Sequence, residues 1–154
     1  MLPKMRRTGG LMDWNVYFVQ GAELLFLGIG SYFDLKEQKL PLWFLLSFGL
    51  GGIMLNLFFR YQSLEELLAG LFVGAVFLMA AWASRESIGY GDGIGLMVLG
   101  CMEGFGRMIP VIFGAFLLSA GFGMWKLVRR RESRESTMPF FPFLLIAWMG
   151  ALIL

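Results

Sequence analysis

The chain has 154 residues, of which 58% are hydrophobic and 16% charged, and its mean hydropathy is +0.70. A soluble domain of this length could not bury so much apolar surface, so the composition excludes a soluble globular protein and indicates a polytopic helical membrane protein. The net charge of +2 gives no reason to expect nucleic acid as a partner, and the length predicts one membrane-embedded domain over residues 1–154.

Six apolar segments predict an all-α bundle of about six transmembrane helices. In chain order we expect spans at Trp14–Phe33, Pro41–Phe59, Ser63–Ala83, Asp92–Phe105, Met108–Val128 and Met138–Leu154. Most are close to the roughly 20 residues that cross a bilayer, and Ser63 with Glu66 resembles a capping box. The fourth span is short, which predicts that Asp92 starts below the membrane surface. No small-residue cleavage site ends the first apolar run, so we expect that run to stay in the protein.

Charge predicts the orientation of the bundle. Six spans put both termini on one side and the three odd-numbered loops on the other. The odd-numbered loops carry Lys36, Lys39, Arg85, Lys126, Arg129, Arg130, Arg131 and Arg134, and the opposite side carries Lys4, Arg6, Arg7, Arg60 and Arg107. The positive-inside rule places the odd-numbered loops in the cytoplasm, with the chain as a multi-pass protein of the cytoplasmic membrane. Asp34 and Asp92 then share the cytoplasmic side.

The residue types that are missing restrict the chemistry. The chain has no histidine, which excludes Ser–His and Cys–His nucleophile pairs and histidine-containing zinc sites. Cys101 is the only cysteine and lies in an apolar run, where an inert packed thiol is expected. We therefore expect neither a metal nor a cofactor, and assign any acid–base catalysis to carboxylates.

Asp34 and Asp92 are the candidate catalytic residues. Asp92 lies among four glycines, at Gly89, Gly91, Gly93 and Gly95, which leave room for another segment to approach. Two carboxylates held together can share one proton, so that one accepts a proton from water while the other polarises a peptide carbonyl. The spacing permits this pair without requiring it. Taken singly, Asp34 fits a solvated loop acid and Asp92 fits a helix cap.

Three motifs together resemble those of the type IV prepilin peptidases. Asp34-Leu-Lys-Glu-Gln-Lys-Leu-Pro41 is similar to a pattern of Asp, five variable residues and Ile/Leu-Pro; Gly89-Tyr-Gly-Asp92 is similar to GxGD; Met138-Pro-Phe-Phe-Pro-Phe143 is similar to the proline–phenylalanine motif that opens the last helix. Members of this family are membrane aspartic endopeptidases that remove the leader from prepilins and prepilin-like proteins. GxGD alone is shared with presenilin-type proteases, whereas the three motifs in this order are specific.

The resemblance implies Asp34 and Asp92 as the catalytic pair. Gly89 and Gly91 would shape the approach to Asp92, and Pro41, Pro139 and Pro142 would shape the rest of the site. The implied partners are the lipid bilayer and a prepilin or pseudopilin-like precursor, in which a short basic leader ends in glycine before a hydrophobic helix. Cleavage would follow that glycine at the cytoplasmic face.

Three departures from the family pattern are visible. Ile94 stands where many members have lysine, and Leu42 stands where many have asparagine. Bifunctional members also carry a cysteine-containing cytoplasmic region and methylate the new N-terminus, whereas this sequence shows no such region. The resemblance is therefore to the compact, peptidase-only form.

Glu23 is a further candidate, because it lies in the middle of the first span. It precedes Asp34 by eleven residues, which returns a helix to nearly the same face, so we expect it to face the interior. It fits either a structural acid, bonded to a serine or a backbone carbonyl, or a substrate contact.

Three alternative functions remain at this stage. One is a presenilin-like protease that cuts within a substrate helix. Another is a non-enzymatic transporter or assembly scaffold that uses Asp34, Asp92 and Glu23 as a proton or ion path. The third is a family member that has lost activity, given Ile94.

Overall fold

The computed structural model describes residues 11–84, 89–130 and 138–154, and within these ranges the chain forms six helices and no strand. The helices are α1 (Leu11–Glu37), α2 (Leu42–Phe59), α3 (Leu64–Ala83), α4 (Tyr90–Glu103), α5 (Phe105–Arg130) and α6 (Phe141–Ile153). The prediction of an all-α bundle is confirmed.

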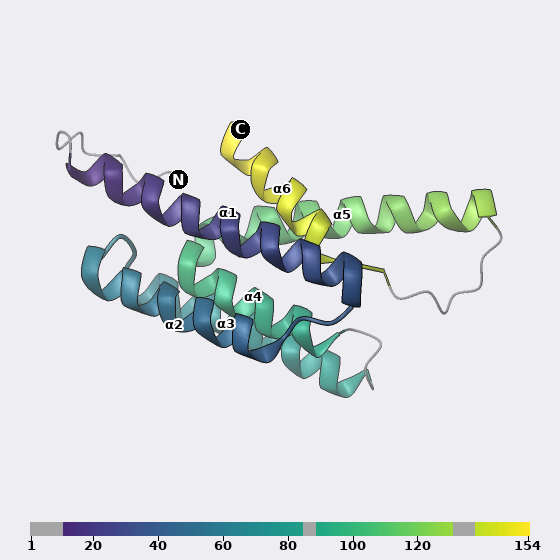
Figure 1. Cartoon of the computed structure of the whole chain (residues 1–154), viewed down its shortest axis with the longest axis horizontal. Helices are drawn as coiled ribbons and strands as arrows, with labels where there is room; N and C mark the ends of the chain where they lie inside the picture. The colour runs from purple at the N-terminus through teal and green to yellow at the C-terminus, as the bar shows by residue number, and fades with distance from the viewer. Residues whose placement is uncertain (1–10, 85–88, 131–137) are drawn as a thin grey trace.

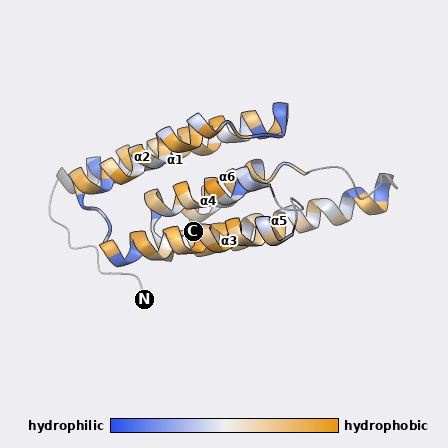
Figure 2. Ribbon diagram, turned by 90° about the horizontal axis from the view of Figure 1, so that it is seen from below, coloured by the Kyte–Doolittle hydropathy of each residue, from blue (hydrophilic) through white to orange (hydrophobic). Residues whose placement is uncertain are grey.

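The helices lie in three layers. In Figure 2, α1 and α2 form one side, α3 and α5 form the other, and α4 and α6 lie between them. The packing agrees with this view, since α4 packs mainly against α3 and α2, whereas α6 packs mainly against α5 and α1. Figure 1 shows α5 as a long helix whose C-terminal half extends beyond the bundle.

Small residues allow α3 and α4 to pack at backbone contact. A Cβ built on Gly70 would lie 2.6 Å from the carbonyl oxygen of Gly100, and a Cβ built on Gly93 would lie 3.0 Å from Cα of Leu78. Glycines at such contacts let helices approach closely in the membrane, where van der Waals packing and interhelical hydrogen bonds favour association. The short helix α4 is consequently enclosed, with most of its residues after Asp92 buried.

Four helices are long and apolar enough to span a membrane, namely α1 from Trp14, α2, α3 and α5. The other two are shorter, and α6 is apolar throughout. The 14 residues of α4 rise only about 21 Å, less than the roughly 30 Å of a hydrocarbon core. Hydrophilic residues gather near the helix ends and in the connections (Figure 2).

The helix boundaries differ from the predicted spans in ways that matter for the site. Helix α1 continues through Asp34 to Glu37, so Asp34 lies within a helix rather than in a loop. Helix α4 begins at Tyr90, with Gly89 as its N-cap, so Asp92 lies in the first turn and is not the cap. The capping box is confirmed on its Ser63 side, where Oγ accepts a hydrogen bond from the backbone N–H of Glu66 at 3.2 Å.

Some of the charge used to predict orientation falls outside the described residues. This applies to Lys4, Arg6, Arg7, Arg85, Arg131 and Arg134. The cytoplasmic orientation of the odd-numbered connections therefore stays a prediction.

Candidate active site

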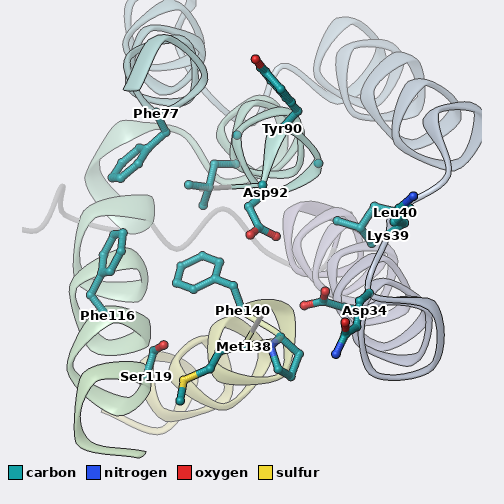
Figure 3. A pocket seen from close by; sticks show the side chains of 16 residues that line it. Asp34, Lys39, Leu40, Phe77, Tyr90, Asp92, Phe116, Ser119, Met138 and Phe140 are labelled. Carbon is teal, nitrogen blue, oxygen red and sulfur yellow. The ribbon is translucent and has the colours of Figure 1, made fainter. Parts of the chain in front are cut away.

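Asp34 and Asp92 line one cavity of about 600 Å³. The cavity lies where the C-terminal end of α1 meets the N-terminal ends of α4 and α6, and it is also lined by residues of α3 and α5. In Figure 3 the two carboxyl groups point into the same space, Asp34 from α1 and Asp92 from α4. The fold thus brings together two acids that are 58 positions apart in the sequence (92 − 34).

Asp34 is held by the start of the last helix. Its side chain is only 7% exposed, and its Oδ2 accepts a hydrogen bond from the backbone N–H of Phe141 at 2.9 Å. That N–H belongs to the first turn of α6, where backbone donors have no partner within their own helix. The positive end of the helix dipole lies there too, so the contact stabilises a negative charge on Asp34.

Asp92 is positioned by the glycines before it. Its backbone N–H donates to the carbonyl of Gly89 at 3.1 Å, which closes the first turn of α4. A Cβ built on Gly89 would lie 3.3 Å from Oδ2 of Asp92, so glycine leaves the carboxyl group uncrowded. A Cβ built on Gly91 would lie 3.3 Å from Cβ of Leu40, so this glycine lets the α1–α2 connection lie against α4.

The two acids interact electrostatically, because the charge of Asp34 acts on Asp92. Lys39 also lines the cavity, but it is exposed to solvent. Two carboxyl groups that interact electrostatically in a partly buried space are most stable when they share one proton. This is the electrostatic arrangement that general acid–base chemistry by paired aspartates requires.

One wall of the cavity is aromatic, which sequence reasoning missed. Phe77 of α3 stacks on Phe116 of α5 with ring centroids 5.5 Å apart, and Phe116 contacts Phe140 with centroids 5.2 Å apart. Figure 3 shows Phe140 beside Asp92, with Phe77 and Phe116 beyond it. No local motif marks Phe77 or Phe116, because each is one apolar residue in an apolar span.

The three prolines assigned to the site differ in whether they line the cavity. Pro139 lines it, whereas Pro41 and Pro142 are not among the described residues that do. Pro41 is the N-cap of α2, and its carbonyl accepts from the backbone N–H of Phe44 at 3.1 Å. Pro142 lies in the first turn of α6, where a missing N–H costs little. Ile94 packs against the hydrophobic core and also lies outside the cavity lining.

Glu23 faces the interior as predicted, but at the other end of α4. It is 3% exposed, and its Oε2 accepts a hydrogen bond from Nε1 of Trp148 at 3.3 Å. Trp148 also donates to Glu103, so its indole N–H is shared between the two glutamates. The prediction that Glu23 bonds to a serine or a backbone carbonyl is therefore wrong, because its partner is the indole of Trp148.

Within the described ranges, no three His, Cys, Asp or Glu side chains are grouped so that they could hold a metal ion.

Comparisons with known proteins give the same family as the motifs around Asp34 and Asp92. The type IV leader peptidase family matches residues 22–124. A prepilin leader peptidase/N-methyltransferase of Xanthomonas campestris is 33% identical over 135 residues, covering 79% of this chain and 45% of that protein. A protein of the same name from Stutzerimonas stutzeri is 29% identical over 155 residues, covering 94% of this chain and 54% of that protein.

The chain thus spans about half the length of these relatives. No solved structure matches it. The family match covers both aspartates and well over half of the sequence, and the chain belongs to the type IV leader peptidase family.

Proposed function

We propose that this protein is a membrane aspartic endopeptidase that removes the leader from type IV prepilin-like precursors, with Asp34 and Asp92 as its catalytic pair. The observation that carries the proposal is that both carboxyl groups face one cavity and interact there. Membership of the leader peptidase family supports the choice of substrate class.

In the proposed reaction a water molecule lies between the two aspartates and attacks the carbonyl carbon of the scissile peptide bond. One aspartate takes a proton from the water while the other donates its proton to the carbonyl oxygen. The resulting tetrahedral intermediate then collapses, the C–N bond breaks, and the leaving nitrogen takes a proton. The products are a leader with a new carboxylate and a mature protein with a new amine. General acid–base catalysis of this kind supplies about 10²–10⁴-fold of rate enhancement.

We assign the ionised role to Asp34. It accepts the N–H of Phe141 at the start of α6, a contact that favours the carboxylate. Asp92 also lies in a first helical turn, that of α4, but no N–H of the described residues donates to its carboxyl group, so Asp92 would then hold the shared proton. Because a coupled pair titrates as a unit, this assignment concerns the resting form, and the roles exchange during the reaction.

The position of the cavity suits a substrate that is part polar and part apolar. The cavity lies where three helices begin or end, so it is near the boundary of the apolar layer. Gln38 and Lys39 form its polar edge, and Phe77, Phe116 and Phe140 form its aromatic wall. A precursor whose hydrophilic leader precedes a hydrophobic helix would place its scissile bond at such a boundary, with the leader's final glycine leaving room for the aspartates.

The test is a gel-shift assay on a tagged prepilin with a glycine-ended leader, co-expressed with this protein. We expect the wild-type protein to shorten the substrate, and Asp34→Asn and Asp92→Asn to leave it intact while still inserting into the membrane. Glu65→Gln serves as the matched control, because Glu65 is an exposed acid in the first turn of α3. Failure of the wild-type protein on several leaders contradicts the proposed substrate class. Cleavage within the hydrophobic helix instead supports a presenilin-like protease.

A further inference from the structure

Phe141 is connected to both helices that carry the aspartates. It is the first residue of α6 and is fully buried. Its ring lies edge-on to that of Phe26 on α1, with centroids 5.8 Å apart, and belongs to the hydrophobic core. Its backbone N–H donates to Asp34. This residue therefore contacts a catalytic carboxylate through its backbone while its side chain fills the space beneath.

Two glycines make room for that side chain, one on each helix. A Cβ built on Gly30 of α1 would lie 2.5 Å from Cδ1 of Phe141 and 2.6 Å from Cε1. A Cβ built on Gly95 of α4 would overlap Cζ of the same ring and lie 2.8 Å from Cε2. The ring thus touches α1 along one edge and α4 at its tip, in direct contact with both backbones.

The glycines lie at matching positions relative to the aspartates. Gly30 precedes Asp34 by four residues, and Gly95 follows Asp92 by three. Residues three or four apart on a helix are neighbours on one face, so each glycine lies one turn below a catalytic side chain. The in-plane width of the Phe141 ring consequently separates the two helices one turn away from the catalytic carboxyl groups.

The direct contact between the two aspartate-bearing helices is small. Helix α1 packs mainly against α6, and α4 packs mainly against α3 and α2. Helices α1 and α4 also contact one another directly, and Phe141 is the residue of α6 whose ring lies between Gly30 and Gly95.

We propose that Phe141 is a positioning residue, a spacer whose ring, seated between Gly30 and Gly95, sets the separation of Asp34 and Asp92. The inference rests on the proposed function of this pair. Misplacing a catalytic group by about 1 Å costs about 100-fold in rate. A spacer makes a prediction that a simple core residue does not. The effect of a methyl group added at a glycine should be offset by removing atoms from the Phe141 ring. The offset should occur only where the removed ring atoms contacted that glycine.

The first test compares the same chemical change at three glycines. Gly30→Ala and Gly95→Ala should each lower kcat by at least about tenfold with little change in KM, because the reacting groups move while the rest of the cavity stays. Gly28→Ala is the matched control, since a Cβ at Gly28 has no atom within 4 Å and the change also lies in α1. It should stay within about twofold of the wild-type rate.

The second test is rescue by a smaller spacer. Leucine at position 141 lacks both ring atoms that meet Gly95 most closely, Cε2 and Cζ, but only one of the two that meet Gly30, because it lacks Cε1 and keeps a Cδ1. Phe141→Leu should therefore restore much of the kcat lost in Gly95→Ala and clearly less of that lost in Gly30→Ala. Equal activity of all three glycine variants, or equal rescue at both glycines, would overturn the spacer.

A third readout does not depend on activity. Cys101 is buried and is the only cysteine, so Cys101→Ala gives a thiol-free background in which Asp34→Cys and Asp92→Cys can be combined. The shortest bis-methanethiosulfonate reagent should cross-link these two thiols efficiently, and adding Gly95→Ala should shift the reaction to a longer reagent. Unchanged cross-linking would contradict the spacer, even if the wild-type protein cleaves no prepilin. If the wild-type protein cleaves no prepilin but the cross-linking shifts as expected, the proposed function is contradicted and the spacer is supported.

Discussion

Trp148 donates the hydrogen of Nε1 to Oε2 of Glu23 at 3.3 Å, which ties the last helix to the middle of the first. Glu103, at the end of α4, joins the same group. Three helices are thus joined by a small polar cluster at the end of α4 that is remote from Asp92.

This cluster predicts a structural role for Glu23. Trp148→Phe removes the shared donor and leaves buried carboxyl oxygens without it, so we expect a loss of about 1–3 kcal/mol in the free energy of unfolding. Glu23→Gln keeps both a donor and an acceptor and should lose less. Thermal unfolding in detergent measures both.

Cleavage assays on the same variants distinguish a structural role of Glu23 from a contact between Glu23 and the substrate. Glu103 lies eleven residues after Asp92, about 16 Å along the helix, so activity per folded molecule should stay within about threefold for Glu23→Gln. A folded Glu23→Gln protein that cleaves nothing would show instead that Glu23 contacts the substrate.

The contact between α3 and α4 predicts a second effect on stability. Gly70→Ala places a methyl group 2.6 Å from the backbone of α4, which overpacks the bundle and should cost about 1–3 kcal/mol. Gly51→Ala on α2 is the control, because a Cβ there meets nothing within 4 Å. It should leave the melting temperature unchanged or slightly raised. Equal melting temperatures for the two variants would contradict the close contact.

The aromatic wall of the cavity predicts an effect on substrate binding. Phe116 is 44% exposed, so Phe116→Ala should cost little stability. It removes apolar surface that a substrate would cover, and we expect KM to rise about three- to tenfold with a smaller change in kcat. Steady-state kinetics on a purified precursor measure both constants. A change in kcat alone would show that the wall acts on the aspartates rather than on the substrate.

Much of the architecture could be predicted from the sequence. Apolar runs predicted all six helices, and four of them have the length that a bilayer imposes on a spanning helix. The alternation of spans predicted that Asp34 and Asp92 share one end of the bundle, and both line one cavity there. The eleven-residue spacing predicted that Glu23 faces inward, and it is buried.

The contacts that define the site could not be predicted in this way. The hydrogen bond from Phe141 to Asp34 joins residues 107 positions apart, and its donor is a backbone group that no side-chain pattern reveals. Gly30 and Gly95 read as ordinary small residues of membrane helices, because only the fold shows that one ring touches both. The polar composition of residues 34–39 suggested a loop, whereas α1 continues to Glu37.

The most direct measurement is the single-turnover cleavage rate of a glycine-leader precursor by purified wild-type protein, Asp34→Asn, Asp92→Asn and the double variant. If the two aspartates act as one unit on a shared water, each single change should lower the rate by at least about a thousandfold, and the double variant should be no slower than either. Substantial cleavage by either single variant, or losses that multiply in the double variant, would contradict a paired mechanism.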